Sequence, residues 1–148
     1  MSIVPFDPAH TDGFRSLVAD TLPEFGFEMD PAFDSDLDEP TRTYTALWVA
    51  VEDEEVVGSV ALRDLGDGVL ELKRMYLRPS CRGLGIGKRL LGVALDYART
   101  HDAVAVRLDT SEQMVAAQRL YEAHGFERVS GSAPRQGQCR LLYELRLG

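Results

Sequence analysis

The feature that most constrains this fold is a glycine-rich loop between an apolar strand pattern and an amphipathic helix. Residues 69–78 have the composition of a strand, and the run that follows is Arg82-Gly83-Leu84-Gly85-Ile86-Gly87-Lys88. Helical periodicity then extends from residue 86 to residue 100. Glycines let a ligand approach the backbone, and the free N–H groups and dipole of a helix start favour an anion. The loop therefore predicts a site for a phosphate-bearing ligand, and a diphosphate suits it.

Two common nucleotide-binding motifs do not fit this loop. The Walker A motif fails at both ends, because Arg82 and Arg89 occupy the positions of a glycine and of a serine or threonine. The pattern Gly-x-Gly-x-x-Gly fails because its third glycine falls on Lys88 or Leu90. The strand before the loop also belongs to a predicted antiparallel meander, whereas a dinucleotide fold needs a parallel unit.

Hydrophobic periodicity and turn residues divide the rest of the chain into strands and helices. Thr110 with Gln113 three residues later has the spacing of a capping box, and Gly125 stands where a helix commonly ends. The turn signals 53–55 and 66–68 join three strands into an antiparallel meander. Strands are predicted over 2–6, 44–52, 56–63, 69–78, 103–108 and 141–147, and helices over 8–22, 86–100 and 113–124, with a short helix among loops in 24–43.

Length and composition predict one domain over residues 1–148, because 148 residues with 45% hydrophobic content suffice for a single core. No apolar run approaches the roughly 20 residues that span a bilayer, and the start lacks a basic leader, so we expect a cytoplasmic protein without a membrane partner. Cys81 and Cys139 have no metal-ligand spacing. We expect neither a disulfide nor a bound metal.

Charge is divided unevenly along the chain. Residues 1–60 contain 14 acids and 2 arginines, whereas residues 61–148 contain 10 acids and 14 lysines and arginines. The net charge of -8 argues against a nucleic-acid partner, which needs a basic face. The asymmetry is consistent with a phosphate-bearing cofactor on the second half and a cationic acceptor near the first, or with a solvated acidic surface.

The loop and a later motif together resemble the GNAT superfamily of acyl-CoA-dependent N-acyltransferases. Arg82, Gly85 and Gly87 fit the pattern Arg/Gln-x-x-Gly-x-Gly/Ala, and Tyr121 begins the ending Tyr-x-x-x-Gly-Phe. The resemblance implies a mixed α/β domain with a central, mostly antiparallel sheet, splayed near its middle, and helices on both faces. It also implies acetyl-CoA as co-substrate and transfer of its acetyl group to a primary amine. Many members carry an asparagine where this chain has Met114, so the contact of that asparagine with the cofactor is missing.

The resemblance assigns roles to particular residues. The end of the strand before the loop would bind the cofactor at Met75, Tyr76 and Leu77, with the backbone N–H groups of Met75 and Leu77 directed to the pantetheine arm and thioester carbonyl. The loop residues 82–88 would hold the diphosphate. Tyr121 would lie near the sulfur as general acid, because a phenol with pKa ~10 keeps its proton at neutral pH. Alternatively, Tyr121 is an aromatic on the buried face of its helix.

The general base has several candidates. Glu71 lies six residues before Leu77, where the histone-acetylating branch of the family carries its base. It is equally well read as a cross-strand partner of a lysine or arginine. Glu28, Asp30 or a water chain are the alternatives, whereas nothing in the sequence places the three histidines near the chemistry.

The function implied is an N-acetyltransferase acting on a primary amine of a small, cationic metabolite by direct attack. A protein acetyltransferase acting on lysines or N-termini, and a non-catalytic acyl-CoA sensor, share the same cofactor loop and remain alternatives. Dimers are common in the family, so a homodimer is one of the states that the resemblance allows.

Overall fold

The computed structural model describes residues 1–135 and 138–148, with the side chains of 1–129 and 140–148. A seven-stranded sheet has the strand order β1-β2-β3-β4-β5-β7-β6. The strands are β1 (Ser2–Pro5), β2 (Ala46–Glu52), β3 (Glu55–Gly66), β4 (Val69–Leu77), β5 (Ala105–Ser111), β6 (Glu127–Arg135) and β7 (Gln138–Arg146). The helices are α1 (Thr11–Thr21), α2 (Pro31–Asp34), α3 (Pro40–Thr43), α4 (Ile86–Thr100) and α5 (Val115–Ala123), with the 3₁₀ turns η1 (Pro8–His10), η2 (Leu22–Phe25), η3 (Ser35–Leu37) and η4 (Pro79–Cys81).

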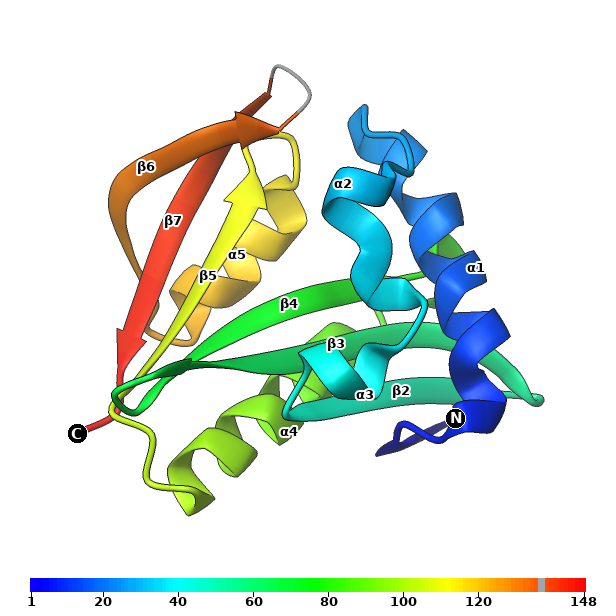
Figure 1. Cartoon of the computed structure of the whole chain (residues 1–148), viewed down its shortest axis with the longest axis horizontal. Coiled ribbons are helices and arrows are strands. Elements are labelled where there is room, and N and C mark those ends of the chain that lie inside the picture. The colour runs from blue at the N-terminus through cyan, green and yellow to red at the C-terminus, as the bar shows by residue number, and fades with distance from the viewer. Residues whose placement is uncertain (136–137) are drawn as a thin grey trace.

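The sheet is split between β4 and β5, its one parallel pair. Within each half of the sheet the pairs are antiparallel: β1–β2, β2–β3 and β3–β4 on one side, and β5–β7 and β7–β6 on the other. The β4–β5 ladder contains only residues 69–71 of β4 and 105–107 of β5. Beyond this ladder the two strands part, as Figure 1 shows. The predicted mixed α/β fold with a splayed, mostly antiparallel sheet is confirmed.

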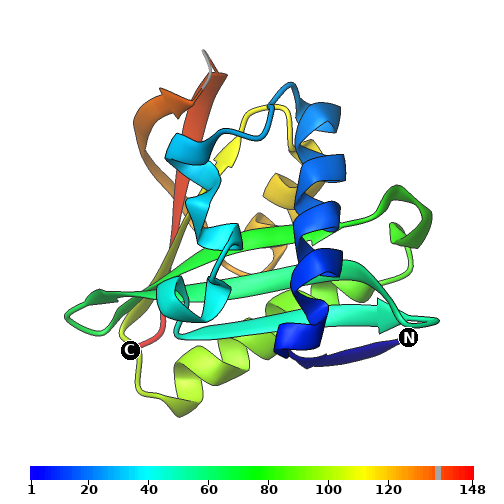
Figure 2. The ribbon, with the colours of Figure 1, turned by 45° about the vertical axis from the view of Figure 1, so that its right-hand side comes forward.

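Helices cover both faces of the sheet. Helices α1, α2 and α3 lie on one face and α4 and α5 on the other, and Figure 2 shows α1 crossing the first of these faces. The amphipathic pattern explains α4: its predicted apolar positions are all buried, and they are Ile86, Leu90, Leu91, Ala94, Leu95 and Ala98. Burying a leucine side chain contributes about 1.5–3 kcal/mol, so this stripe holds α4 against the sheet.

The segment between α1 and β2 differs from the prediction of one short helix. It forms η2, α2, η3 and α3 in succession, because proline favours the first position of a helix and Pro31 and Pro40 begin α2 and α3. The Asp30 side chain caps α2 by accepting a hydrogen bond from the backbone N–H of Ala32 at 2.9 Å. These short turns bury Phe27 and Leu37 against α1 and β3.

Two predictions near the C-terminal half were wrong. Thr110 is not a helix cap, because it belongs to β5, and residues 111–114 form a turn before α5 begins at Val115. The Ser111 hydroxyl accepts the N–H of Gln113 at 3.2 Å within this turn, and the N-cap residue of α5, Met114, makes no side-chain capping hydrogen bond. Strand β6 was not predicted, whereas Gly125, with φ +91°, ends α5 as expected.

A β-bulge interrupts β4 at Arg74. Ser59 pairs with Tyr76 and Ala61 pairs with Lys73, so one residue of β3 faces two of β4. Arg74 has φ +52°, a left-handed conformation that costs a non-glycine residue roughly 1–2 kcal/mol. The Ser59 hydroxyl donates to the Arg74 carbonyl at 2.6 Å and satisfies this backbone group. The bulge therefore changes the direction of the residues that follow it in β4, from Met75 to Leu77.

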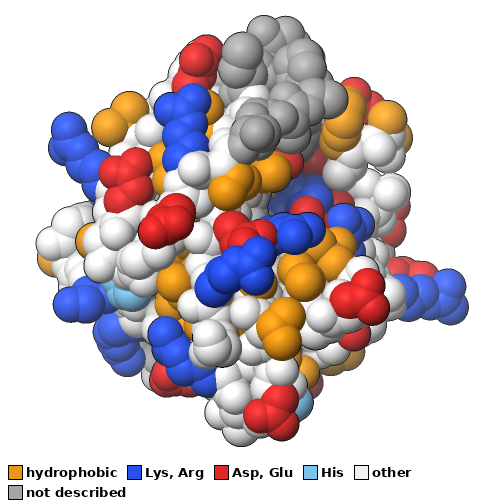
Figure 3. All heavy atoms as spheres, turned by 90° about the vertical axis from the view of Figure 1, so that its left-hand side faces the viewer, with side chains coloured by type: hydrophobic (Ala, Val, Ile, Leu, Met, Phe, Trp, Pro, Cys, Tyr) orange, Lys and Arg blue, Asp and Glu red, His pale blue; other side chains and the backbone are white. Residues whose placement is uncertain are grey.

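Further structural findings concern the described residues. None of their helices has the length and apolar character needed to cross a membrane, and their acids, histidines and cysteines form no group placed to bind a metal ion. Cys81 is buried with a free thiol, and the side chain of Cys139 lies outside the described residues. On the side of the molecule formed by β5 to β7, acidic and basic side chains alternate (Figure 3), as in the ion pairs of Glu144 with Arg107 and Arg146.

Candidate active site

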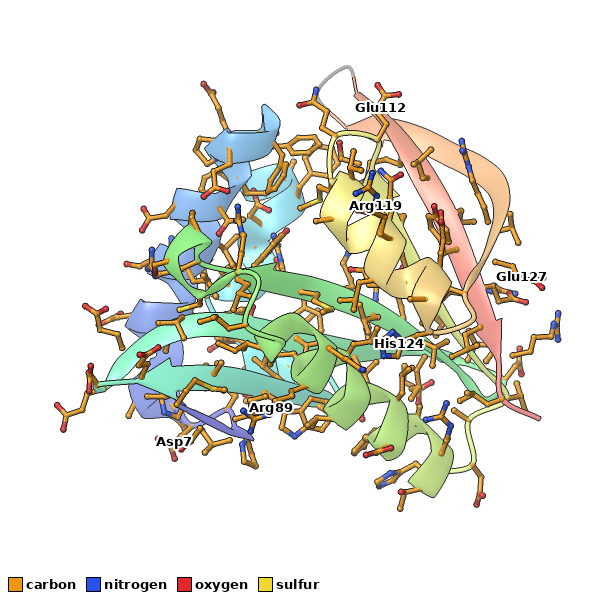
Figure 4. All side chains as sticks on the ribbon, turned by 180° about the vertical axis from the view of Figure 1, so that it is seen from behind. Asp7, Arg89, Glu112, Arg119, His124 and Glu127 are labelled. Carbon is orange, nitrogen blue, oxygen red and sulfur yellow. The ribbon has the colours of Figure 1, made fainter. Side chains whose placement is uncertain are left out.

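A groove of about 460 Å³ lies where the glycine loop, the end of β4 and the start of α5 meet. Helices α4 and α5 lie on the same face of the sheet (Figure 4), and the N-terminal residues of both line this groove. Their first turns carry backbone N–H groups without partners inside the helix, so they favour a negatively charged ligand. The lining includes eight residues predicted to bind the cofactor: Met75, Tyr76, Leu77, Arg82, Gly83, Gly85, Gly87 and Lys88.

The loop glycines fit a ligand that approaches the backbone. Gly85 has φ +81°, which side chains rarely adopt, and it precedes the first residue of α4. At Gly87 an added Cβ would lie 3.6 Å from Leu120 Cδ2 and 3.9 Å from Met75 Cε, two side chains that also line the groove. A side chain at position 87 therefore takes space from the groove. Leu84 and Ile86 do not line it: Leu84 is exposed, and Ile86 is buried in the core.

Arg82 links the loop to both neighbouring segments. Its Nε donates to the Leu77 carbonyl at 3.0 Å, and its Nη2 lies 2.7 Å from Glu24 Oε2. The guanidinium also lies over the Phe25 ring, 5.8 Å from its centroid. Arg82 thus holds η2 against the mouth of the loop, where Phe25 lines the groove.

A second cavity of about 220 Å³ adjoins the groove. Both are lined by Met75, Tyr76, Met114 and Ala117, so the two spaces meet at the end of β4 and the start of α5. The remaining lining of the second cavity comes from both halves of the split sheet and from the segment after α1: Leu22, Phe27, Phe33, Leu72, Lys73, Arg74, Asp109, Thr110, Tyr121 and Arg140. We call it the acceptor cavity.

Tyr121 is the buried residue of α5, and it lines the acceptor cavity. Its ring packs near Phe126 and Tyr143, with centroid distances of 5.7 and 6.3 Å. Burial raises the pKa of the Tyr121 hydroxyl, nearby Tyr76 raises it further, and Arg140 opposes the shift. The phenol therefore keeps its proton at neutral pH. Tyr121 is thus an aromatic on the buried face of α5, as the alternative interpretation predicted, and it also lines a cavity.

Sequence reasoning missed Arg74, which is almost fully buried. Its Nε and Nη2 donate to Asp36 at 3.0 and 2.7 Å, and Nη2 also donates to Asp34 at 2.8 Å. The Tyr44 hydroxyl donates to Asp36 as well. Burial by itself raises the pKa of Asp36, but the hydrogen bond and charge of Arg74 outweigh it and hold that pKa below its usual value. This network fastens α2 and η3 to the bulge of β4.

The Asp36 pKa shift predicts how stability depends on pH. A carboxyl whose pKa is lower in the folded than in the unfolded protein stabilises the fold above its unfolded value, here near 3.8, and loses that contribution as pH falls through the folded value. Asp36→Asn is expected to lower the free energy of unfolding by about 1–2 kcal/mol at pH 7 and to weaken the loss below about pH 4. Urea unfolding from pH 7 to pH 3 measures both.

Asp38→Asn is the matched control, because Asp38 pairs with Arg15 on the surface, where both side chains are more than half exposed. Such a pair contributes about 0–1 kcal/mol. Equal effects of the two substitutions at pH 7 would contradict the network's role.

Most acids between Glu24 and Glu39, which belong to the acidic half that suggested a cationic acceptor, form ion pairs within the protein. Besides Asp34 and Asp36, these acids pair as Glu24 with Arg82, Asp38 with Arg15 and Glu39 with Arg42. The nitrogen–oxygen distances in the ion pairs of Asp34, Asp36, Glu24 and Glu39 range from 2.7 to 2.9 Å. The observation that favoured a cationic acceptor is thus accounted for by contacts within the protein.

The structure does not place the three candidate bases in the acceptor cavity. Glu71 pairs across strands with Arg63 at 2.8 Å, as its alternative interpretation predicted, and Lys73 lies 3.9 Å from the same oxygen. Asp30 caps α2, and neither it nor Glu28 lines either space. Sequence reasoning missed Asp109. Of the described residues that line the acceptor cavity, it is the only one with a carboxylate side chain.

The histidines make local hydrogen bonds. His10 Nδ1 accepts the Asp7 N–H at 3.0 Å, and the Nδ1 atoms of His101 and His124 lie 2.9 Å from carbonyls one turn earlier in their helices. None of the three lines the groove or the acceptor cavity. The prediction of surface or packing roles fits these contacts.

This fold and this pair of adjoining spaces define an N-acetyltransferase that depends on acetyl-CoA. Residues 12–126 match the Acetyltransferase (GNAT) family, and the chain belongs to it. An uncharacterized N-acetyltransferase from Schizosaccharomyces pombe is 35% identical over 129 residues, which cover 81% of this chain and 78% of that protein.

Two further proteins are similar to this chain. Human N-acetylaspartate synthetase is 43% identical over 89 residues, covering 60% of this chain but only 30% of the longer human protein. An acetyltransferase from Salmonella typhimurium, solved with its cofactor acetyl-CoA, superposes with a TM-score of 0.80 at 20% identity over 99% of this chain and 94% of that one. At 20% identity, the similarity to the Salmonella typhimurium structure concerns the fold alone.

Proposed function

We propose that the protein transfers the acetyl group of acetyl-CoA to the primary amine of a small molecule bound in the acceptor cavity. The observation that carries this proposal is the junction of the two spaces at Met75, Tyr76, Met114 and Ala117. The groove, bordered by two helix starts, suits a diphosphate, and the acceptor cavity would bring an amine to the same junction. With ~30 Å³ for each water-sized group, about 220 Å³ suits a small metabolite.

The end of β4 is our candidate for binding the thioester. Because the β4–β5 ladder ends at Glu71, β5 does not cover the backbone edge from Met75 to Leu77. The bulge at Arg74 re-aims this stretch, whose side chains line the groove. We assign the backbone N–H groups of Met75 and Leu77 to the pantetheine arm and to the carbonyl oxygen that becomes negative during attack.

Tyr121 is our candidate for the general acid. The amine nitrogen attacks the carbonyl carbon of the thioester, the C–S bond breaks, and the leaving sulfur takes the phenolic proton. A buried phenol with a raised pKa is protonated when this step occurs, and a thiol with pKa ~8.5 is the stronger acid of the two. After the attack the nitrogen carries an extra proton, and its transfer through water to the Tyr121 phenolate leaves a neutral amide and restores the phenol.

The amine must lose a proton before it attacks, because an alkyl amine with pKa ~10.4 is mostly protonated at neutral pH. Asp109 is our candidate to receive this proton, directly or through water, since it lines the acceptor cavity. Its Oδ1 pairs with Arg140 at 3.0 Å, and no described residue donates a hydrogen bond to its Oδ2. Glu71 stays an untested candidate, and its ion pair with Arg63 favours a structural role.

Replacing each carboxylate separates these two candidates. Asp109→Asn is expected to lower kcat/KM about tenfold, more strongly at pH 6 than at pH 9, because the amine is more fully protonated at the lower pH. Glu71→Gln is expected to stay within about twofold of the wild type. Initial rates between pH 6 and pH 9 measure both, and the reverse order of effects would return the role of base to Glu71.

Thiol release from acetyl-CoA tests the proposed function across a panel of amines. Amino acids, polyamines, aminoglycosides and peptides with a free lysine or N-terminus cover the candidate acceptors. Acetylation of a small amine supports the proposal, and turnover restricted to peptides would favour a protein acetyltransferase. Tight acetyl-CoA binding without transfer to any amine would favour a sensor.

A single domain over residues 1–148, a cytoplasmic location and a homodimer stay predictions.

A further inference from the structure

Basic side chains outnumber acids in the lining of the acceptor cavity. Lys73, Arg74 and Arg140 line it together with one acid of the described residues, Asp109. The Tyr121 hydroxyl adds a further donor, whereas the Thr110 hydroxyl already donates to Met114 Sδ at 3.4 Å. Hydrogen-bond donors are therefore in excess, and an acceptor molecule that supplies oxygen atoms satisfies them.

The basic residues differ in how far the protein itself neutralises them. Arg74 donates to two carboxylates that lie within the buried network, so its charge is already balanced. Lys73 has its nearest acid at 3.9 Å and is about one-third exposed. Arg140 pairs with Asp109, whose side chain is itself about one-third exposed.

Arg140 is the guanidinium with the most donors left for a ligand. Its Nη2 donates to Asp109 Oδ1 at 3.0 Å and to the Asp109 carbonyl at 3.4 Å. No described residue accepts a hydrogen bond from its Nε or Nη1. The group is held over the Phe27 ring, 5.6 Å from the centroid, and its side chain is only 17% exposed. A fixed, shielded fork of N–H donors matches a planar carboxylate.

Asp109 and Arg140 together complement a zwitterion. A carboxylate on the free nitrogens of Arg140 and an ammonium on Oδ2 of Asp109 would each meet the opposite charge. The pair lines the same cavity as Tyr121, and the charges of both residues act on the Tyr121 hydroxyl. An amine held by Asp109 therefore lies on the side of the cavity where the leaving sulfur is to be protonated.

We infer that the acceptor is a small amine that also carries a carboxylate, as an amino acid does, and that Arg140 binds this carboxylate. This inference rests on the proposed N-acetyltransferase function and names its substrate class. A peptide N-terminus lacks a free carboxylate beside its amine, and a polyamine has none. Both classes are thus disfavoured as acceptors.

The test compares each L-amino acid with its carboxamide and with the amine that remains after decarboxylation. Steady-state rates with acetyl-CoA are expected to give a kcat/KM at least tenfold higher for the carboxylate-bearing member of the best set, since a hydrogen bond to a charged group contributes about 1.5–3 kcal/mol. Arg140→Met is expected to remove at least tenfold of that preference, chiefly by raising KM for the carboxylate-bearing member of the set.

Arg107→Met is the matched control, because Arg107 also pairs with a carboxylate, Glu144 at 2.8 Å, but lies outside the acceptor cavity. Arg140→Lys, which keeps the charge, covers the case in which Arg140→Met fails to fold, and it should retain part of the preference while raising KM. Equal rates for carboxylate, carboxamide and plain amine would overturn the inference and leave the proposed function standing. If acetyl-CoA binds and no member of any set is acetylated, the proposed function itself fails.

Discussion

Gly87→Val is expected to weaken acetyl-CoA binding by about 10²-fold or more while the protein stays folded. The added Cβ would lie among Leu120, Met75 and the groove, at ordinary contact distances from both side chains, so the fold can accept it. The branched carbons then occupy the space beside the first turn of α4. Losing two hydrogen bonds to a charged group costs about 3–6 kcal/mol, which exceeds a 10²-fold change in affinity. Isothermal titration calorimetry with acetyl-CoA measures the change.

Gly92→Val is the matched control for this substitution. Gly92 lies in the same helix, no atom comes within 4 Å of its added Cβ, and it does not line the groove. Both variants exchange glycine for valine in α4, so a thermal melt separates lost stability from lost binding. If Gly87→Val binds acetyl-CoA as tightly as Gly92→Val, the groove is not the cofactor site.

Gly85→Val is the less informative substitution at this loop. Gly85 has φ +81°, so a valine there is strained by about 1–3 kcal/mol even though nothing lies within 4 Å of its added Cβ. Lost binding by that variant could therefore come from a moved loop. Gly87 lies within α4 and has no positive φ, so a valine there tests the blocked groove without backbone strain.

Tyr121→Phe is expected to lower kcat about 10²-fold with little change in acetyl-CoA affinity. The substitution removes the hydroxyl and keeps the ring that packs near Phe126 and Tyr143. A lost general acid costs about 10²–10⁴-fold, and solvent can protonate part of the leaving thiolate, so the lower end applies. The measurement is kcat with the best amine under conditions in which chemistry limits turnover.

Tyr143→Phe controls for the loss of a buried hydroxyl. Tyr143 is buried beside Tyr121 and donates to Glu122 at 2.8 Å, but it lines neither the groove nor the acceptor cavity. We expect this variant to lose stability and to keep its turnover. A Tyr121→Phe enzyme with more than about half of the wild-type kcat would remove Tyr121 from the mechanism.

The parts of the structure that were predictable from sequence depend on local signals. Helix α4 begins at Ile86 and ends at Thr100 as predicted, because its apolar stripe and the glycines before it both act within a few residues. The meander β2 to β4 follows from alternating residues and tight turns. The loop glycines line the predicted groove for the same reason: their geometry is set by neighbours in the chain.

Sequence reasoning failed where distant partners decide the outcome. Arg74 is buried because Asp34 and Asp36, about 40 residues earlier, meet it in space. The charge counts showed that residues 1–60 are acidic. They could not show that acids such as Asp34, Asp36 and Glu24 form ion pairs within the protein. Strand β6 carries glycine, proline and serine and pairs with β7 alone, so its edge position comes from the sheet and not from its own composition.

The Arg74 network has a consequence for anyone who redesigns the acceptor specificity. Residues 22–43 supply Leu22, Phe27 and Phe33 to the acceptor cavity, which makes this segment the natural unit to exchange between family members. A transplanted segment without carboxylates at positions 34 and 36 would leave the guanidinium in β4 buried and unpaired, beside a backbone bulge that its contacts help to hold. Chimeras are therefore viable only when the donor segment and the recipient strand carry this charge match together.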